Sequence, residues 1–246
     1  NTQRDNVMTR YSKTQRVRRI IEMLDVNHST TINQLAEYFT VSHMTIRRDI
    51  EELQKNGQVK VIFGGQVIKG FINESPEYKD KAQHHIAWKK EIALQAYKLL
   101  RPGEIVFMDG GTTVKQLAWL IDIPLTVITN DISTAYILND RPNIKLLICP
   151  GELVRESRSA YCTETLRYLS EHYTDLAFIG ADGFDENYGA MTTTQSKADC
   201  KWMAMSRAAK SVLLVDKSKH NVFCHYKITD LAEFSQVIVN SDSLMR

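Results

Sequence analysis

The chain has 246 residues and a formal net charge of +2, with 43% hydrophobic and 24% charged residues. This length fits one large and one small globular domain, and a net charge so close to zero does not by itself identify a partner. No apolar run approaches the length of a membrane span and the first ten residues are polar, so we expect a cytoplasmic protein with no membrane partner.

Positive charge is concentrated towards the amino terminus. Residues 1–70 hold eleven lysines and arginines against seven acidic residues, whereas residues 71–246 hold twenty against twenty-two. The basic residues that lead into the first predicted helix are Arg10, Lys13, Arg16, Arg18 and Arg19. Such an asymmetry is typical of a nucleic-acid-binding end attached to a neutral body, although a charge run is more often only a solvated surface.

Residues 30–56 have the pattern of two short helices joined by a tight turn. In the first, apolar residues from Ile32 to Phe39 recur at helical spacing, and Thr30 or Thr31 can cap the amino end. Thr40 and Val41 form the turn, and Ser42 is a suitable cap for the second helix. The second helix buries the stripe Ile46, Ile50 and Leu53, which predicts a helix-turn-helix.

The opposite face of the second helix carries hydroxyl, imidazole and guanidinium groups. These groups can read base edges and bind phosphates in the major groove of duplex DNA. The predicted DNA-contacting residues are Ser42, His43, Met44, Thr45, Arg47 and Arg48, together with Lys60 in the segment that follows. The alternative is an ordinary helical hairpin with a solvated basic face.

The flanking segments favour the DNA-binding alternative. A helix over residues 12–26 can complete a three-helix core, and Gly57 ends the second helix of the pair. Residues 59–63 and 66–68 form two β-prone runs joined through Gly64 and Gly65, which predicts a small hairpin. We therefore expect a winged helix-turn-helix domain over residues 1–68, followed by a linker over residues 69–85.

Residues 86–246 alternate between short apolar strands and helices. This alternation predicts an α/β domain with a mostly parallel sheet that is covered on both faces. The expected strands are 105–108, 125–129, 144–148, 176–179, 212–215 and 237–239, and the expected helices are 91–100, 114–121, 132–138, 163–172 and 197–209.

Small and polar residues follow the predicted strands, where ligands bind in open α/β sheets. The candidate ligand-binding residues are Asp109, Gly110, Gly111, Thr112, Thr113, Asn130, Asp131, Gly151, Gly180, Asp182, Gly183 and Lys219, with Lys201 and Arg155 as further cations. Two glycines, two threonines and a helix start at Thr113 can cradle a phosphate, although such a turn is often only a tight turn. The acidic and amide groups suit the hydroxyls of a sugar.

No metal or cofactor is expected. The cysteines, which are Cys149, Cys162, Cys200 and Cys224, lie far apart and form no C-x-x-C pair, so they indicate neither a zinc site nor a disulfide framework. His84 and His85 are adjacent, but neighbouring side chains on a helix point about 100° apart, and no acidic or cysteine partner lies at ligand spacing.

The segment VSHMTIRRDIEEL, with Gly57 and Gly64-Gly65 behind it, resembles the amino-terminal signature of the DeoR-type regulators of bacterial sugar catabolism. The later segments FMDGGTT, VITND, PGE, FIGADG, CKWMAM and LLVDKSK resemble the landmarks of the family's sensor domain. The resemblance implies that the second helix reads DNA, that the body senses a phosphorylated sugar, and that the body is similar in fold to ribose-phosphate isomerases. Two residues depart from the family pattern: Lys197 stands where a glutamate is usual, and Glu152 where a glycine is usual.

Three functions remain open at this stage. The first is a repressor of a sugar-catabolism operon, a dimer or tetramer that binds double-stranded operator DNA under the control of a phosphorylated sugar. The second is a sugar-phosphate isomerase with a DNA-binding head, in which Asp182 would be the base; it is disfavoured by the lysine at position 197 and by DENYGAM, which has no lysine before its glycine. The third is an architectural DNA-binding protein whose body only oligomerises.

Overall fold

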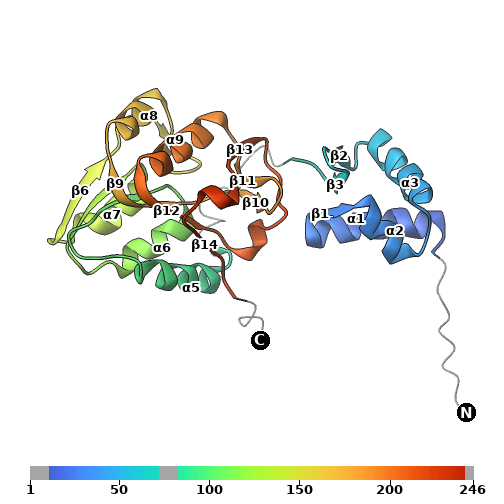
Figure 1. The fold of residues 1–246 in the computed structure, drawn as a ribbon, viewed down its shortest axis with the longest axis horizontal. Helices are drawn as coiled ribbons and strands as arrows, with labels where there is room; N and C mark the ends of the chain where they lie inside the picture. The colour runs from blue at the N-terminus through green and yellow to red at the C-terminus, as the bar shows by residue number, and fades with distance from the viewer. Residues whose placement is uncertain (1–10, 72–82, 242–246) are drawn as a thin grey trace, which may run out of the picture. The chain divides into compact units, whose positions relative to one another are not determined.

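The computed structural model describes residues 11–71 and 83–241. The chain divides into two compact units, residues 1–71 and residues 72–246 (Figure 1). We call the described part of the first unit the head and that of the second unit the body.

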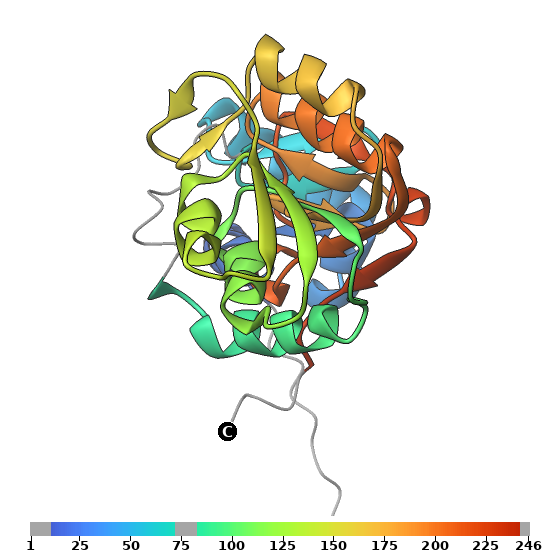
Figure 2. The same ribbon diagram turned by 90° about the vertical axis from the view of Figure 1, so that its left-hand side faces the viewer.

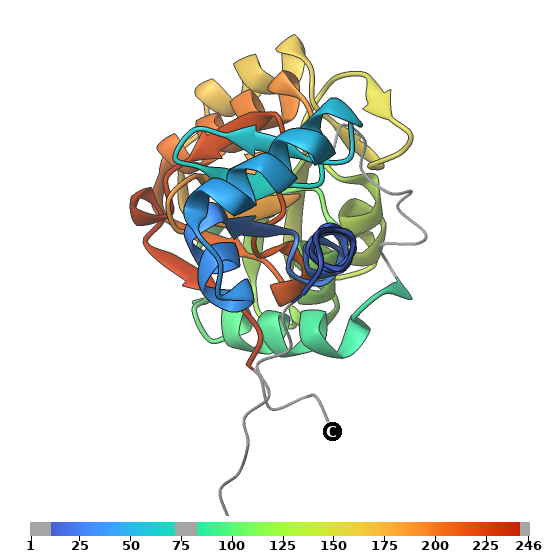
Figure 3. The same cartoon turned by 90° about the vertical axis from the view of Figure 1, so that its right-hand side faces the viewer.

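The head is a three-helix domain with a small antiparallel sheet (Figure 3). Its elements are α1 (Lys13–Asn27), β1 (Ser29–Thr31), α2 (Ile32–Phe39), α3 (His43–Lys55), β2 (Lys60–Ile62) and β3 (Gln66–Ile68). The apolar stripes of the three helices pack together, so that Ile20, Leu35 and Ile46 are fully buried. The predicted winged helix-turn-helix is confirmed.

Side-chain caps fix where the three helices begin. Ser12, Thr31 and Ser42 each accept a hydrogen bond from the backbone N–H three residues ahead, which satisfies a donor that the helix leaves unpaired. Thr31 also ends β1, a strand that pairs with β3 and that the sequence pattern did not predict. The tight turn of the wing uses Gly64 and Gly65, both with positive φ.

The body contains a six-stranded parallel sheet in the order β14-β12-β9-β4-β5-β6. The strands are β4 (Ile105–Met108), β5 (Leu125–Thr129), β6 (Ile144–Ile148), β9 (Thr174–Ile179), β12 (Ala208–Leu214) and β14 (Gln236–Ile238). The helices are α5 (Ile86–Tyr97), α6 (Thr112–Leu120), α7 (Ile132–Asn139), α8 (Thr163–Ser170) and α9 (Gln195–Ser206). The predicted α/β fold with a mostly parallel sheet is therefore confirmed.

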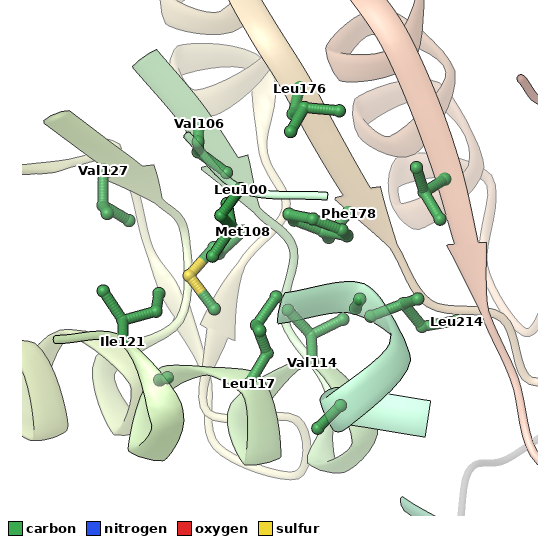
Figure 4. Close-up of a cluster of buried hydrophobic side chains, with 14 of the residues drawn as sticks. Leu100, Val106, Met108, Val114, Leu117, Ile121, Val127, Leu176, Phe178 and Leu214 are labelled. Atoms are coloured by element: carbon green, nitrogen blue, oxygen red, sulfur yellow. The ribbon is translucent and has the colours of Figure 1, made fainter. Parts of the chain in front are cut away.

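Helices cover both faces of this sheet, with α5, α6 and α7 on one side and α8 and α9 on the other (Figure 2). Alternate strand residues point to opposite faces, so Val106 and Met108 pack towards α6 whereas Phe107 packs towards α8 and α9. The side chains between the sheet and α5, α6 and α7 form one hydrophobic core (Figure 4). In this core, Leu117 of α6 lies under Met108 and Phe178.

Two small antiparallel sheets were not predicted. β7 (Leu153–Val154) pairs with β8 (Ser159–Ala160), and β11 (Gly189–Thr192) lies between β10 (Gly183–Asp185) and β13 (Tyr226–Thr229). Within the described residues, no helix is both long and apolar enough to cross a membrane.

The order of the large sheet reverses between β4 and β9. The chain runs outward from β4 through β5 to β6, and then crosses to the other side of β4 to continue through β9, β12 and β14. Loops that leave the carboxyl ends of two such strands diverge, which opens a crevice between them. The crevice is bordered by residues that follow Met108 and Ile179.

Candidate functional site

A cavity of about 480 Å³ lies at this reversal point. It is lined by His84, His85, Lys89, Gly110, Gly111, Thr112, Thr113, Val114, Glu156, Ser157, Tyr161, Gly180, Ala181, Asp182, Lys197, Lys201, Leu214, Val215, Asp216, Ser218 and Lys219. The volume is within the range of roughly 300–1,000 Å³ that is usual for small-molecule sites. The structure thus brings together most of the predicted ligand-binding residues.

The loop after β4 forms one wall of the cavity. The helix α6 begins at Thr112, one residue before the predicted start, and its N-cap Gly111 supplies no side-chain cap. The first N–H groups of α6 and the positive end of its dipole are therefore available to an anion. Gly110 lets the backbone of this loop lie against Ser159, because a Cβ atom at position 110 would lie 2.0 Å from Ser159 Oγ.

A buried ion pair supports this loop from below. Asp109 is 1% exposed and pairs with the ammonium group of Lys201, which lines the cavity from α9. The carboxylate of Asp109 also accepts hydrogen bonds from Tyr161 Oη at 3.0 Å and from the Gly180 N–H at 3.0 Å. The last of these bonds ties the ends of β4 and β9 together. Burial, and then the charge of Asp109, raise the pKa of Tyr161 well above its usual value, so its hydroxyl stays protonated and donates.

The cavity lining contains four lysines and three carboxylates. Lys201, Lys219 and Asp182 were predicted from the sequence, whereas the other cavity residues of this group, Lys89, Lys197, Glu156 and Asp216, were not. Lys89 is buried on α5. Lys197 Nζ donates to Thr193 Oγ1 at 3.2 Å. Hydroxyl or backbone groups hold two carboxylates in place, because Asp182 accepts from Thr192 Oγ1 and Asp216 accepts from the Ser218 N–H.

His84 and His85 line the same cavity, although the sequence pattern placed them in the linker. His85 adopts a left-handed backbone conformation before α5, and its ring stacks on Trp88 at 4.1 Å between centroids. No cluster of three or more potential metal ligands occurs among the described residues. The remainder of the predicted linker, residues 72–82, lies outside them.

Six of the predicted ligand-binding residues do not line the cavity: Asp109, which supports the loop from below, and Asn130, Asp131, Gly151, Arg155 and Gly183. Gly151 and Gly183 are packing positions, because a Cβ atom would lie 2.2 Å from Cys162 Sγ or 2.0 Å from Val222 O, respectively. Arg155 is exposed, while its neighbours Glu156 and Ser157 reach the cavity.

The other two, Asn130 and Asp131, are buried beneath the site and have structural contacts. The Asn130 side chain accepts from the Gly110 N–H at 3.0 Å and donates to Ala160 O at 3.0 Å, so it positions the loop after β4. Asp131 caps α7 through the Ser133 and Thr134 N–H groups. Burial raises the pKa of Asp131 to about 6.

In the head, the predicted DNA-contacting face of α3 is accessible. Ser42, His43, Met44, Arg47 and Arg48 are exposed, and neither arginine forms an ion pair with any other described residue. The Ser42 hydroxyl caps α3 through the Thr45 N–H, so the cap occupies part of its hydrogen-bonding capacity. Lys60 is exposed on β2, where its ammonium lies 5.5 Å from the centroid of the Phe71 ring.

The basic residues of α1 contribute less to this surface than their number suggested. Arg16 is buried and forms two hydrogen bonds to Asp49 of α3, at 2.7 and 3.2 Å, so it joins two helices instead of facing solvent. Lys13 pairs with Glu52, and Arg18 and Arg19 both pair with Glu22. Arg10 lies outside the described residues. The exposed basic residues of α1 are therefore balanced by glutamates, whereas no ion pair among the described residues balances Arg47 and Arg48 of α3.

Two models of known protein families match the chain, one over the head and one over the body. The model of the DeoR-like helix-turn-helix domain matches residues 16–69, and that of the DeoR C terminal sensor domain matches residues 84–241. The L-fucose operon activator of Escherichia coli K12 is 31% identical over 229 residues, which are 92% of this chain and 94% of that protein. The HTH-type transcriptional repressor GlcR of Bacillus subtilis is 27% identical over 90% of this chain and 86% of its own length.

A structure of ribose 5-phosphate isomerase A from Methanocaldococcus jannaschii aligns with 54% of this chain and 53% of its own, with a TM-score of 0.40 and 19% identity. Both family models together span the head and the body, and the curated relatives align over nearly the full length. The chain belongs to the DeoR family of DNA-binding transcriptional regulators.

Proposed function

We propose that this regulator is a repressor of a sugar-catabolism operon and that a phosphorylated sugar, bound in the cavity of the body, controls its affinity for operator DNA. The observation that carries the proposal is the cavity at the reversal point of the sheet, where an uncapped helix start and several lysines meet. GlcR is named a repressor, whereas the relative from the fucose operon is named an activator. A reporter assay tests whether this chain represses or activates transcription.

The phosphate would bind at the Gly110–Thr113 loop. There the backbone N–H groups and the dipole of α6 favour a negative group, and Lys201 adds a positive charge that Asp109 holds in place. The loop needs little rearrangement, because Asn130 and Ser159 already fix its path. A preformed cradle costs less conformational entropy on binding than a flexible one.

The sugar hydroxyls would contact the remainder of the lining. Carboxylate and hydroxyl groups at Asp182, Asp216 and Ser218 can accept from or donate to a polyol, and the apolar side chains of the lining are only Val114, Ala181, Leu214 and Val215. This composition suits a small polar ligand better than a lipid or an aromatic compound.

Ligand binding would act on DNA through the spacing of two heads in a dimer or tetramer. A rigid pair of heads fits half-sites that are about one helical turn apart, or a multiple of it. An effector can move such an equilibrium only by its differential affinity for the two arrangements. We therefore expect the ligand-bound oligomer to bind the operator more weakly than the free one.

The test combines DNA binding with ligand binding on the full chain. Fluorescence anisotropy with duplexes from the protein's own operon should show sequence-specific binding that weakens steeply with salt. A panel of sugar phosphates should contain a compound that raises the melting temperature and lowers operator affinity. Thr112→Val should weaken both responses to that compound and leave basal DNA binding unchanged. Thr126→Val, at the amino-terminal end of β5, is the matched control and should behave like the wild type.

Two results would overturn the proposal. One is DNA binding with no preference for any duplex at any salt concentration. The other is a sugar phosphate that regulates DNA binding equally well in the wild type and in the Thr112→Val variant.

A further inference from the structure

We infer, building on the oligomer of the proposed function, that two copies of this chain join through β6, the edge strand of the large sheet. The two strands pair antiparallel across a two-fold axis, so that the sheet of one copy continues into that of the other. β6 is the last strand of the sheet on its side, and no strand among the described residues pairs with its outer edge (Figure 2).

The outer edge of β6 carries backbone groups that can form this pairing. On the inner edge, the N–H of Cys149 donates to Thr129 O at 2.8 Å, so the odd-numbered residues of this segment face β5. The N–H and C=O groups of the alternate residues Leu146 and Ile148 therefore point away from β5. A row of such groups is a template for a further strand.

The sequence of β6, IKLLI, is suited to pairing with itself. Ile144 and Leu146 pack towards α6 and α7, and Ile148 belongs to the same face because alternate side chains share a face. In an antiparallel pair centred on Leu146, each Ile144 lies opposite Ile148 of the second copy. Lys145, which carries the only charge of the strand, belongs to the other face, where Leu147 of the second copy lies opposite it. No like charges therefore stand directly opposite each other.

Exposed apolar side chains lie beside β6. Ile132 and Tyr136 lie one turn apart on α7, which packs against β6, and Leu153 lies on β7 shortly after the strand. The β7–β8 hairpin is joined to the start of α7 by a hydrogen bond from the Ile132 N–H to Arg158 O at 3.0 Å. We call Ile132, Tyr136, Ile148 and Leu153 the edge patch.

The area of the edge patch fits the apolar centre of a dimer interface. Tyr136 is 80% exposed and Ile148 is 55% exposed, and the four side chains together expose on the order of 400 Å². This is close to the largest apolar patch of a typical monomer, and a stable interface covers roughly 800 Å² per partner, with polar groups at its rim. A second copy brings the same strand and the same patch, so a two-fold axis makes the two surfaces complementary.

Sedimentation velocity of the full chain, from nanomolar to micromolar concentration, tests the interface. The wild type should form a dimer, or a tetramer built from such dimers. Tyr136→Glu and Ile148→Glu should each raise the dissociation constant of the dimer by at least about 100-fold, because a symmetric interface contains the substituted position twice and a tenfold loss at each site multiplies. Circular dichroism and urea denaturation check that the variants fold.

Leu94→Glu is the matched control. Leu94 is 55% exposed, like Ile148, but it lies on α5, which packs near β12 and β14 at the other edge of the sheet. This substitution introduces the same charge at an equally exposed position, so it should leave the dissociation constant unchanged.

Hydrogen exchange tests whether the strand itself is paired. The amides of Leu146 and Ile148 should be protected in the dimeric wild type and should exchange at least about 10-fold faster in Tyr136→Glu, whose substitution lies on α7 and leaves the sequence of β6 intact. The amide of Leu147, which faces β5, should be protected in both proteins.

Three results would overturn the inference. They are a wild type that is monomeric at tens of micromolar, a dimer that neither substitution weakens, and protected Leu146 and Ile148 amides in a monomer, which would assign another segment of the same chain to this edge.

Thermal shift with the panel of sugar phosphates separates this inference from the proposed function. The Tyr136→Glu protein should keep the shift, because the edge patch does not line the cavity. If dimers form through β6 and no sugar phosphate binds, the inference stands and the proposed phosphosugar control is wrong. If a sugar phosphate regulates DNA binding in a dimer that forms elsewhere, the inference is wrong and the proposed function stands.

Discussion

Replacement of Lys201 with methionine should destabilise the body substantially, because it leaves the Asp109 carboxylate buried without its counter-ion. Loss of one partner from a buried ion pair costs about 3–5 kcal/mol. Asp109 would keep its hydrogen bonds from Tyr161 and Gly180, so we expect the lower end, about 3 kcal/mol. For a domain of this size, that corresponds to a fall in Tm of roughly 6–12 °C.

The assay is urea denaturation followed by tryptophan fluorescence. Trp88, Trp119 and Trp202 all belong to the body, so the signal reports its unfolding separately from that of the head. The double variant Asp109→Asn/Lys201→Met should be more stable than the sum of the two single losses predicts, by at least about 1 kcal/mol. Two results would refute the idea that this ion pair supports the loop. One is a loss of less than about 1 kcal/mol in the unfolding free energy of Lys201→Met, and the other is a double variant whose loss equals the sum of the two single losses.

Three further predictions concern the DNA surface, the Gly110–Thr113 loop and the cap of α7. Arg47→Ala and Arg48→Ala should each weaken operator binding by about 1–3 kcal/mol if the side chain reads a base, and a uniform loss on all duplexes in an anisotropy titration would assign it to a phosphate instead. Gly110→Ala should abolish the thermal shift caused by the effector while the head still binds DNA, because the new Cβ atom would overlap Ser159; a normal shift would contradict the loop as the ligand contact. Asp131 has a folded pKa of about 6, above its unfolded value, so its protonated form favours folding and stability is lost as pH rises from about 4 to 6. Asp131→Asn should remove up to about 3 kcal/mol of that loss. If the urea midpoints of the wild type and the variant change equally between pH 4 and pH 7, Asp131 does not cause the pH dependence of stability.

Local sequence signals predicted most of the secondary structure. These signals are local in the chain. The cap at Ser42 and the buried stripe with Ile46 and Leu53 belong to one helix, and the wing turn involves only the neighbours Gly64 and Gly65. The strands that escaped prediction are short and owe their existence to distant partners. β1 forms only because residues near position 67 pair with it, and β11 needs β13, which lies nearly forty residues later.

The site could be predicted only in part for a related reason. Examination of the strand ends found Gly110, Thr112 and Lys219, but it also included residues after β5 and β6, such as Asn130 and Gly151. Those strands lie on one side of β4, away from the reversal between β4 and β9, so Asn130 packs beneath the loop and Gly151 packs against Cys162, and neither lines the cavity.

The residues that sequence analysis missed come from segments without a strand-end signal. His84, His85 and Lys89 precede the first strand of the body, and nothing in their neighbourhood indicates that α5 brings them to the cavity. Lys197 was noticed only as a departure from the family pattern. Its place on the cavity wall depends on the angle at which α9 packs, which the three-dimensional structure alone provides.

The hydrogen bond from Gly180 to Asp109 joins two positions that are seventy-one residues apart in the chain. During synthesis on the ribosome, the head can fold as soon as it emerges, because its core residues all lie between positions 11 and 68. The central strand β4 must instead wait for β9 before its second edge is paired, and β9 in turn needs β12. A nascent chain would therefore complete its helix-turn-helix domain well before it completes its sensor domain.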